Sequence, residues 1–121
     1  MSEVEPERGD VWWVRFDPAE GSEARKTRPA VVISTPALAR VPVRIVVPLT
    51  TWQPRFEEHV NKVRVGRTDD NNLDVDSAAD TLLLRGVALT RFEDFIGRVD
   101  GAVLAEIVSG VALAIRFPDR P

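Results

Sequence analysis

Short apolar runs recur along the first hundred residues, and turn-forming residues separate them. The runs are rich in Val, Ile, Leu and aromatic residues and are four to seven residues long, which is short for a helix and typical of β-strands. The pattern therefore predicts a strand in each run, over residues 11–16, 30–34, 43–47, 59–65, 81–85 and 96–99.

The alternation within the first run predicts which side chains enter the core. Trp12, Val14 and Phe16 share one face of an extended strand, since successive side chains point to opposite faces. We expect Trp12 and Phe16 to be buried. The run at 30–34 is apolar on both faces and is expected to be a central strand.

Prolines mark the expected ends of several strands. Proline donates no hydrogen bond to a neighbouring strand, so Pro18 and Pro48 are each expected to end the run before them. Residues 49–54 are then predicted to form a loop that carries two threonines and a tryptophan.

The pattern changes to a helical one near the carboxyl end. Asp100 is placed to cap a helix, and the apolar residues after it recur at helical spacing over a broad stripe. Such a stripe suits packing on the sheet and also on a second copy of the chain. Gly110 costs up to about 1 kcal/mol relative to alanine in a helix, so we expect it to be kept for close packing. A helical turn is expected at 89–94.

Short strands closed by one helix predict a mainly β fold with a C-terminal helix, arranged as a small, partly open barrel. At 121 residues the chain is expected to form one domain. Residues 1–8 are polar and are expected to form a flexible N-terminus, residues 9–117 the domain, and the proline-containing residues 118–121 a tail.

Composition narrows the class of protein. The chain has no cysteine and one histidine, which argues against a disulfide framework and against thiolate or histidine-rich metal sites, so no metal and no cofactor are expected. No apolar run approaches a membrane span, and the amino terminus is acidic where a signal peptide would be basic. We expect a soluble, cytoplasmic protein without membrane contact.

Charge is distributed unevenly along the chain. The formal net charge is −3, but residues 15–67 carry ten cations and five acids, while both flanking segments are acidic. A basic middle segment predicts that one face of the protein binds a polyanion, unless folding disperses the cations over the surface.

The loop before the second strand concentrates candidate chemistry. Residues 21–29 hold Arg25, Lys26 and Arg28 together with the carboxylate of Glu23, immediately before the apolar run. Binding and catalytic groups often sit on loops that a rigid scaffold holds. The same charges are also consistent with a solvated surface loop.

A series of short motifs resembles the MazF/PemK family of toxin endoribonucleases. The motifs occur in one order, which is typical of the family: Arg8-Gly9-Asp10-Val11, Gly21-Ser22-Glu23, Arg28-Pro29-Ala30-Val31-Val32 and Val47-Pro48-Leu49-Thr50-Thr51, followed by Leu73-Asp74, Ser77, Arg85, Arg91-Phe92 and Ile96-Gly97-Arg98. The resemblance covers about residues 8–116.

The resemblance implies a homodimer of SH3-like barrels that cuts single-stranded RNA at a short sequence without a metal, in a groove at the dimer interface. By residue-for-residue match, the family's catalytic arginine falls on Arg28 and its catalytic threonine on Thr50. The family's Asp-Gln pair is replaced here by Leu82-Leu83. Any role of that aspartate therefore has no counterpart at those positions.

The chemistry of RNA cleavage by the 2′-hydroxyl fits these residue types. A guanidinium forks onto phosphate oxygens, which suits Arg28, and Thr50 can donate a hydroxyl hydrogen bond to the same phosphate. Glu23 is the candidate carboxylate for proton transfer, although it also suits pairing with a neighbouring cation. His59 is a weaker candidate, because it lies away from the matching motifs. For Thr50 alone, a turn hydroxyl bonded to its own backbone is the alternative.

RNA binding is expected to use cations for phosphates and aromatic rings for unpaired bases. Trp52 and Phe56 follow Thr50 and are candidates for stacking, with core packing as the alternative, more so for Phe56. The predicted RNA-binding set is Arg25, Lys26, Thr51, Trp52, Arg55 and Arg85.

The predicted partner besides RNA is a MazE-like antitoxin whose acidic, disordered segment folds into the basic groove. Two alternatives stay open. One is a gyrase-poisoning toxin of the CcdB kind, which uses a carboxyl-terminal Trp-Gly-Ile that this chain lacks. The other is an SH3-like binding module without catalysis.

Overall fold

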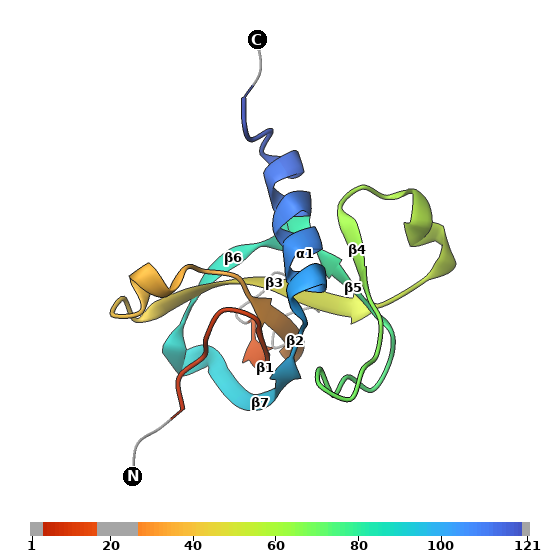
Figure 1. The fold of residues 1–121 in the computed structure, drawn as a ribbon. Coiled ribbons are helices and arrows are strands. Elements are labelled where there is room, and N and C mark those ends of the chain that lie inside the picture. Colours follow the sequence, from red (N-terminus) through yellow and green to blue (C-terminus); the bar gives the residue numbers. More distant parts are fainter. Residues whose placement is uncertain (1–3, 17–26, 120–121) are drawn as a thin grey trace.

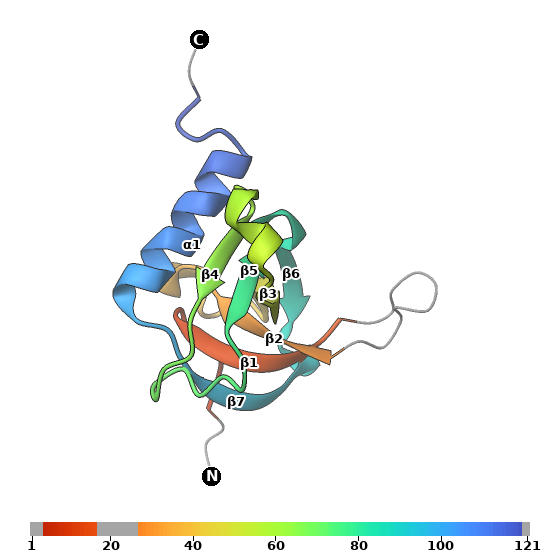
Figure 2. The same cartoon turned by 90° about the vertical axis from the view of Figure 1, so that its right-hand side faces the viewer.

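The computed structural model describes residues 4–16 and 27–119, in which seven antiparallel strands, one α-helix and short 3₁₀ helices form the fold. The strands pair in the order β4-β5-β3-β2-β1-β7, with β6 added beside β3, so the sheet curves without closing (Figures 1 and 2). Their bounds are β1 Asp10–Arg15, β2 Thr27–Val32, β3 Val43–Thr51, β4 Lys62–Val65, β5 Ser77–Asp80, β6 Arg85–Ala88 and β7 Phe92–Arg98, and helix α1 is Gly101–Ala114. This confirms the mainly β, partly open fold with a C-terminal helix.

Strand β3 is the centre of the sheet and runs through its proline. It pairs with β2 on one side; on the other it pairs first with β6 through Val46 and then with β5 from Leu49 onward. Pro48 lies between these two partners, where no donor is needed on that side. The prediction that the strand stops at Pro48, with a loop at 49–54, was therefore wrong, and Thr50 and Thr51 are strand residues.

Two apolar clusters lie on opposite faces of the central strands. The first faces α1 and is built around Val11, Leu49 and Ile107. The second is built around Trp12 and Phe16, which confirms their predicted burial. Both faces of β1 are thus covered, and the apolar run at 30–34 is central as expected.

Helix α1 starts as predicted. The Asp100 carboxylate accepts a hydrogen bond from the Val103 backbone N–H at 2.8 Å, which satisfies one of the free donors of the first turn. A Cβ on Gly110 would lie 3.0 Å from a methyl of Thr81 and 3.1 Å from one of Val63. Gly110 therefore allows the helix to approach β4 and the 3₁₀ helix η4 (Thr81–Leu83) closely.

Three other strand predictions need correction. Residues 81–85 do not form a buried strand, because Asp80 caps η4 by accepting from the Leu82 N–H at 3.1 Å, and Leu82 and Leu83 are exposed. Strand β4 occupies only the end of the predicted 59–65, since residues 54–58 form the 3₁₀ helix η3 and His59 caps it. Strand β7 begins at Phe92, so the helical turn is shorter than expected and is the 3₁₀ helix η5 at Leu89–Arg91.

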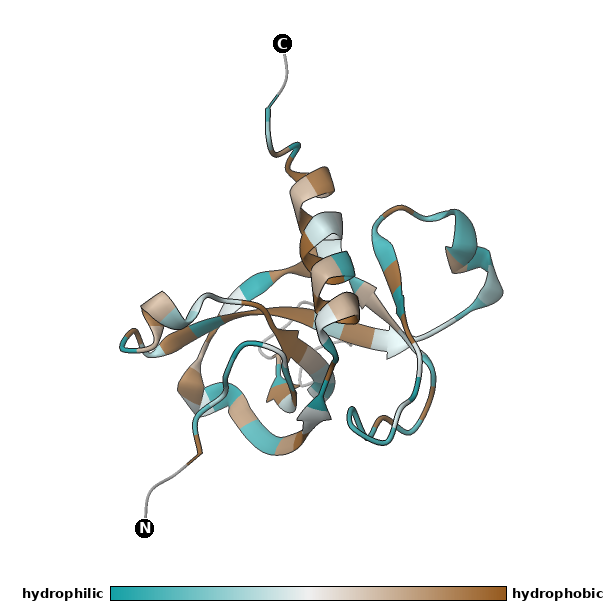
Figure 3. Ribbon diagram, in the orientation of Figure 1, coloured by the Kyte–Doolittle hydropathy of each residue, from teal (hydrophilic) through white to brown (hydrophobic). Residues whose placement is uncertain are grey.

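The colouring in Figure 3 shows apolar residues along α1 as far as its carboxyl end. Within the described residues, no helix is long and apolar enough to cross a membrane.

Candidate active site

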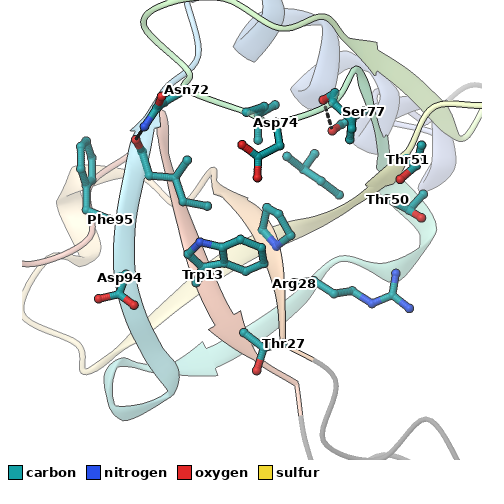
Figure 4. Close-up of a pocket in the computed structure, with 15 residues that line it drawn as sticks. Trp13, Thr27, Arg28, Thr50, Thr51, Asn72, Asp74, Ser77, Asp94 and Phe95 are labelled. Atoms are coloured by element: carbon teal, nitrogen blue, oxygen red, sulfur yellow. Dashed lines mark hydrogen bonds between the residues drawn. The ribbon is translucent and has the colours of Figure 1, made fainter.

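A pocket of about 600 Å³ opens where β2, β3 and β7 meet the loop before β5. Arg28 comes from β2, Thr50 and Thr51 from the end of β3, and Phe95 from β7 (Figure 4). The remaining lining residues are Trp13, Thr27, Pro29, Leu49, Asn72, Leu73, Asp74, Val75, Ser77, Asp94 and Ile96.

The strand register brings Arg28 and Thr50 together. Pro48 lies opposite Ala30 in the β2–β3 pair, and the same register carried two residues further places Thr50 across from Arg28. The Arg28 side chain extends toward Thr50 in Figure 4, and both residues are half-buried. On its other side Thr50 pairs with Ala78 of β5, so its backbone is fixed by the sheet. A permanent cation and a hydroxyl thus share one wall of the pocket.

The opposite wall is a loop that buried contacts hold in place. The Asn71 side chain is buried; its oxygen accepts from the backbone N–H groups of Thr68 and Leu73 at 3.0 and 3.1 Å, and its amide donates to the Gly66 carbonyl at 2.7 Å. The loop backbone rests on β7 at Gly97, where a Cβ would lie 2.5 Å from the Asp70 carbonyl oxygen. The residues that follow are therefore held at the pocket by a fixed loop.

Two carboxylates reach this pocket. Asp74 projects from the fixed loop with its carboxylate pointing into the pocket, and Asp94 lies on the rim opposite Arg28 (Figure 4). The Ser77 hydroxyl, by contrast, donates to the Val75 carbonyl at 3.0 Å and is buried. It fixes the turn before β5. The predicted carboxylate Glu23 lies outside the described residues, as do Arg25 and Lys26.

The structure places the other predicted binding residues outside this pocket, with the exception of Thr51. Trp52 lies just beyond the end of β3, beside Phe56, whose ring is buried. The Arg55 guanidinium sits 5.3 Å from the centre of the Phe56 ring, and Arg85 sits 5.5 Å from that of Phe16, on the far cluster. The ring of His59 packs on Phe56 at 5.7 Å, away from Arg28.

Sequence reasoning missed several pocket residues, and Trp13 and Asp74 show how the topology supplies them. Trp13 lies opposite Pro29 in the β1–β2 pair, so the β2 segment that carries Arg28 brings the indole with it. Asp74 belongs to one of the family motifs, but the sequence does not identify it as a site carboxylate. Its position in the pocket depends on a loop fold that no periodic pattern reveals.

One carboxyl near the site has a shifted pKa. The Arg67 backbone N–H donates to the Asp76 carboxylate at 2.9 Å and the Arg64 guanidinium donates to it at 3.3 Å, and these contacts lower the pKa of Asp76 below its usual 3.8. No group of three or more potential metal ligands gathers in the part of the chain that the structure describes. The polar side chains among the described residues that line the pocket are a guanidinium, hydroxyls, an amide and carboxylates.

Solved structures of similar fold include MazF proteins. MazF (Form-I) from Deinococcus radiodurans aligns with a TM-score of 0.76 over 95% of this chain and 100% of that chain, at 20% identity. An endoribonuclease in complex with its cognate antitoxin from a mycobacterial species aligns with a TM-score of 0.73 over 95% of this chain and 99% of that chain, at 22% identity. These likenesses show a shared fold.

Comparison of sequences goes further than the fold. Endoribonuclease MazF9 of Mycobacterium tuberculosis is 34% identical over 115 residues, which span 88% of this chain and 92% of the relative. Endoribonuclease toxin MazF of Escherichia coli K12 is 53% identical over a shorter stretch of 34 residues, 28% of this chain and 31% of that protein. The family described as "PemK-like, MazF-like toxin of type II toxin-antitoxin system" matches residues 7–115. The chain therefore belongs to the MazF/PemK family of type II toxins.

Proposed function

We propose that this protein is a sequence-selective endoribonuclease that cleaves single-stranded RNA in the Arg28–Thr50 pocket. The observation that carries the proposal is the shared wall formed by Arg28 and Thr50, two residues that come from different strands and meet through the β2–β3 register. One relative named an endoribonuclease matches most of the chain, and another matches a shorter stretch of it.

The reaction needs no group beyond side chains. The 2′-hydroxyl oxygen attacks the adjacent phosphorus, a new P–O2′ bond forms, and the P–O5′ bond breaks, which leaves a 2′,3′-cyclic phosphate and a 5′-hydroxyl. Negative charge grows on the phosphoryl oxygens as the bond forms. Arg28 donates two hydrogen bonds to those oxygens and Thr50 a third, and such fixed donors typically contribute about 10²–10³-fold in rate.

Two protons must also move, one from the 2′-hydroxyl and one to the departing 5′-oxygen. Of the two described carboxylates that line the pocket, Asp74 is the one that points into it, and we propose it as the proton acceptor alongside the predicted Glu23. Its loop is fixed by Asn71, so the carboxylate keeps its position during the reaction. Neither assignment uses His59.

The proposed partners follow from the same site. A MazE-like antitoxin with an acidic, disordered segment would fold against the pocket and exclude RNA. The structural relatives include MazE–MazF complexes, which supports this choice. A toxin that cuts RNA acts where RNA is translated, so we propose a cytoplasmic protein.

We propose that the active form is a homodimer of SH3-like barrels. Large apolar side chains are exposed at the carboxyl end of α1 and on η4, which packs beside α1 at Gly110. Several exposed large apolar side chains on two elements that pack together favour a protein contact on this side. The side chains are those of Leu82, Leu83, Leu113, Ile115 and Phe117, with exposed fractions of 66%, 54%, 62%, 71% and 72%.

The test is cleavage of a long unstructured RNA in EDTA, with mapping of the new ends. We expect discrete cuts that bear 5′-hydroxyls, and we expect Arg28→Ala and Thr50→Ala to cut at least about 10²-fold more slowly while remaining folded dimers. Arg40→Ala is the matched control, because Arg40 is exposed and lies outside the pocket. Full activity in Arg28→Ala would show that the assignment is wrong, and no cutting by the folded wild-type dimer would contradict the proposed function itself.

A further inference from the structure

A second hollow of about 380 Å³ adjoins the Arg28–Thr50 pocket. Three residues line both cavities: Thr51, Asp74 and Val75. Beyond them, the second hollow extends to Trp52 and Arg67. Asp76 completes its lining. A strand of RNA that places one phosphate at Arg28 and Thr50 therefore meets this second hollow next.

The Trp52 ring is held in position before any ligand arrives. Its backbone N–H donates to the Asp76 carbonyl at 2.9 Å, and its indole meets the Phe56 ring edge-to-face with centroids 5.7 Å apart. The Arg64 guanidinium lies 5.1 Å from the indole centroid. Because the ring remains partly exposed and lines the hollow, it offers a fixed aromatic surface.

Asp76 contacts the two arginines of this region through different groups. Its carboxylate accepts from the Arg64 side chain at 3.3 Å but from the backbone N–H of Arg67 at 2.9 Å. The Arg64 guanidinium is therefore paired directly with Asp76. The Arg67 guanidinium also attracts the Asp76 carboxylate, but among the described residues Arg67 contacts that carboxylate through its backbone N–H. The Arg67 side chain lines the hollow, where its guanidinium can also reach a ligand.

We propose that this hollow binds the nucleotide next to the cleaved phosphodiester, with its base stacked on Trp52 and its phosphate paired with Arg67. The inference rests on the proposed function and adds a substrate subsite to it. An aromatic ring and a guanidinium that line one hollow match what single-stranded RNA presents at each nucleotide, a base face and a phosphate. The subsite makes cleavage depend on a flanking nucleotide that the catalytic pair does not touch.

The experiment measures binding of RNAs that carry 2′-deoxyribose at the cleaved nucleotide, so that no 2′-hydroxyl can react. One RNA extends past the cleaved bond on both sides, and two truncated RNAs end at it on one side or the other. We expect Trp52→Ala to weaken binding of the long RNA by roughly 5- to 150-fold, the range for one lost base stack. Its affinity for the RNA that lacks the flanking nucleotide should equal that of wild type, and Trp52→Phe should restore most of the loss.

Arg67→Ala tests the phosphate contact separately and does not depend on the packing of Trp52. Removal of one phosphate contact to a single strand lowers the slope of log K against log salt by about 0.7. We expect this change for Arg67→Ala and none for Arg40→Ala, whose side chain is exposed elsewhere. Circular dichroism of each variant shows that the fold is kept.

The outcomes separate this inference from the proposed function. Equal losses on long and truncated RNAs in Trp52→Ala, or an unchanged salt slope in Arg67→Ala, would overturn the subsite while the wild type still cuts RNA. Variants that bind RNA normally but lose affinity for an acidic antitoxin peptide would make the hollow a protein site and also contradict the proposal. A wild type that neither cuts nor binds RNA would overturn the proposed function first.

Discussion

Gly97 is the point at which one methyl group should disturb both stability and the site. Gly97 is buried in β7, opposite Val11 of β1, and the loop that carries Asp74 lies directly over it. A Cβ there would lie 2.5 Å from the Asp70 carbonyl oxygen and 2.6 Å from that of Asn71. Both atoms belong to backbone, so no side-chain rotation relieves the contact. Gly97→Ala must therefore move the loop by at least about 0.5 Å or bend β7.

The size of the effect follows from the kind of contact. Over-packing a buried site costs about 1–3 kcal/mol, and each kcal/mol lowers the Tm of a domain of this size by roughly 4 °C. We expect Gly97→Ala to lower Tm by roughly 4–12 °C at fixed protein concentration, measured by circular dichroism. Cleavage by the folded protein should also slow, since Asp74 and Asn72 move with the loop.

Gly101→Ala is the matched control for Gly97→Ala. Gly101 is the first residue of α1, and a Cβ there meets nothing within 4 Å. We expect its stability to stay within about 0.5 kcal/mol of wild type and its activity to be unchanged. A Gly97→Ala protein as stable and as active as Gly101→Ala would refute the idea that a rigid loop positions this wall of the pocket.

Two further predictions concern the dimer and acid pH. Ile115→Glu places a charge on the exposed apolar end of α1. We expect it to raise the dimer dissociation constant, measured by sedimentation equilibrium, without unfolding the monomer. An unchanged dissociation constant would mean that the dimer uses another surface. Because the Arg67 N–H and the Arg64 guanidinium lower the pKa of Asp76, its contribution to stability is present above the ordinary pKa of 3.8 and is lost as pH falls through the lower folded value. Urea unfolding should thus show wild type more stable than Asp76→Asn at pH 6, with the difference vanishing at strongly acidic pH; a constant difference would contradict the linkage.

Local pattern predicted the elements whose cause is local. The apolar alternation of β1 and the Asp100 cap each act within a few residues, and the structure shows both as expected. Pro48 misled the prediction because a proline ends a strand only where a neighbouring strand needs the N–H that proline lacks. At Pro48 the partner of β3 changes from β6 to β5, so no N–H is needed there, and sequence alone does not show this change. The run at 81–85 misled it for a similar reason, since an apolar run alone does not separate a buried core strand from an exposed apolar segment such as Leu82-Leu83.

The residues of the candidate site also divide into those that the sequence predicts and those that depend on distant contacts. Arg28 and Thr50 are visible in sequence because each follows from a strand end and a family motif, and the register then joins them. Asp74 depends on the side-chain contacts of Asn71 and on the bare backbone at Gly97. Those contacts link residues that no repeat or periodicity relates. A prediction from sequence pattern alone therefore does not place Asp74 in the pocket.

The replacement of the family's Asp-Gln pair gains a physical interpretation from the same topology. Ser77, at the start of β5, lies opposite Thr51, whereas Leu82 and Leu83 follow the other end of that strand and line no part of the Arg28–Thr50 pocket. The change therefore leaves intact the pocket wall that we propose for phosphate binding. It adds two exposed leucines beside α1, on the surface that we propose for the second copy. We therefore expect the substitution to affect how two chains meet more than how one chain holds a phosphate.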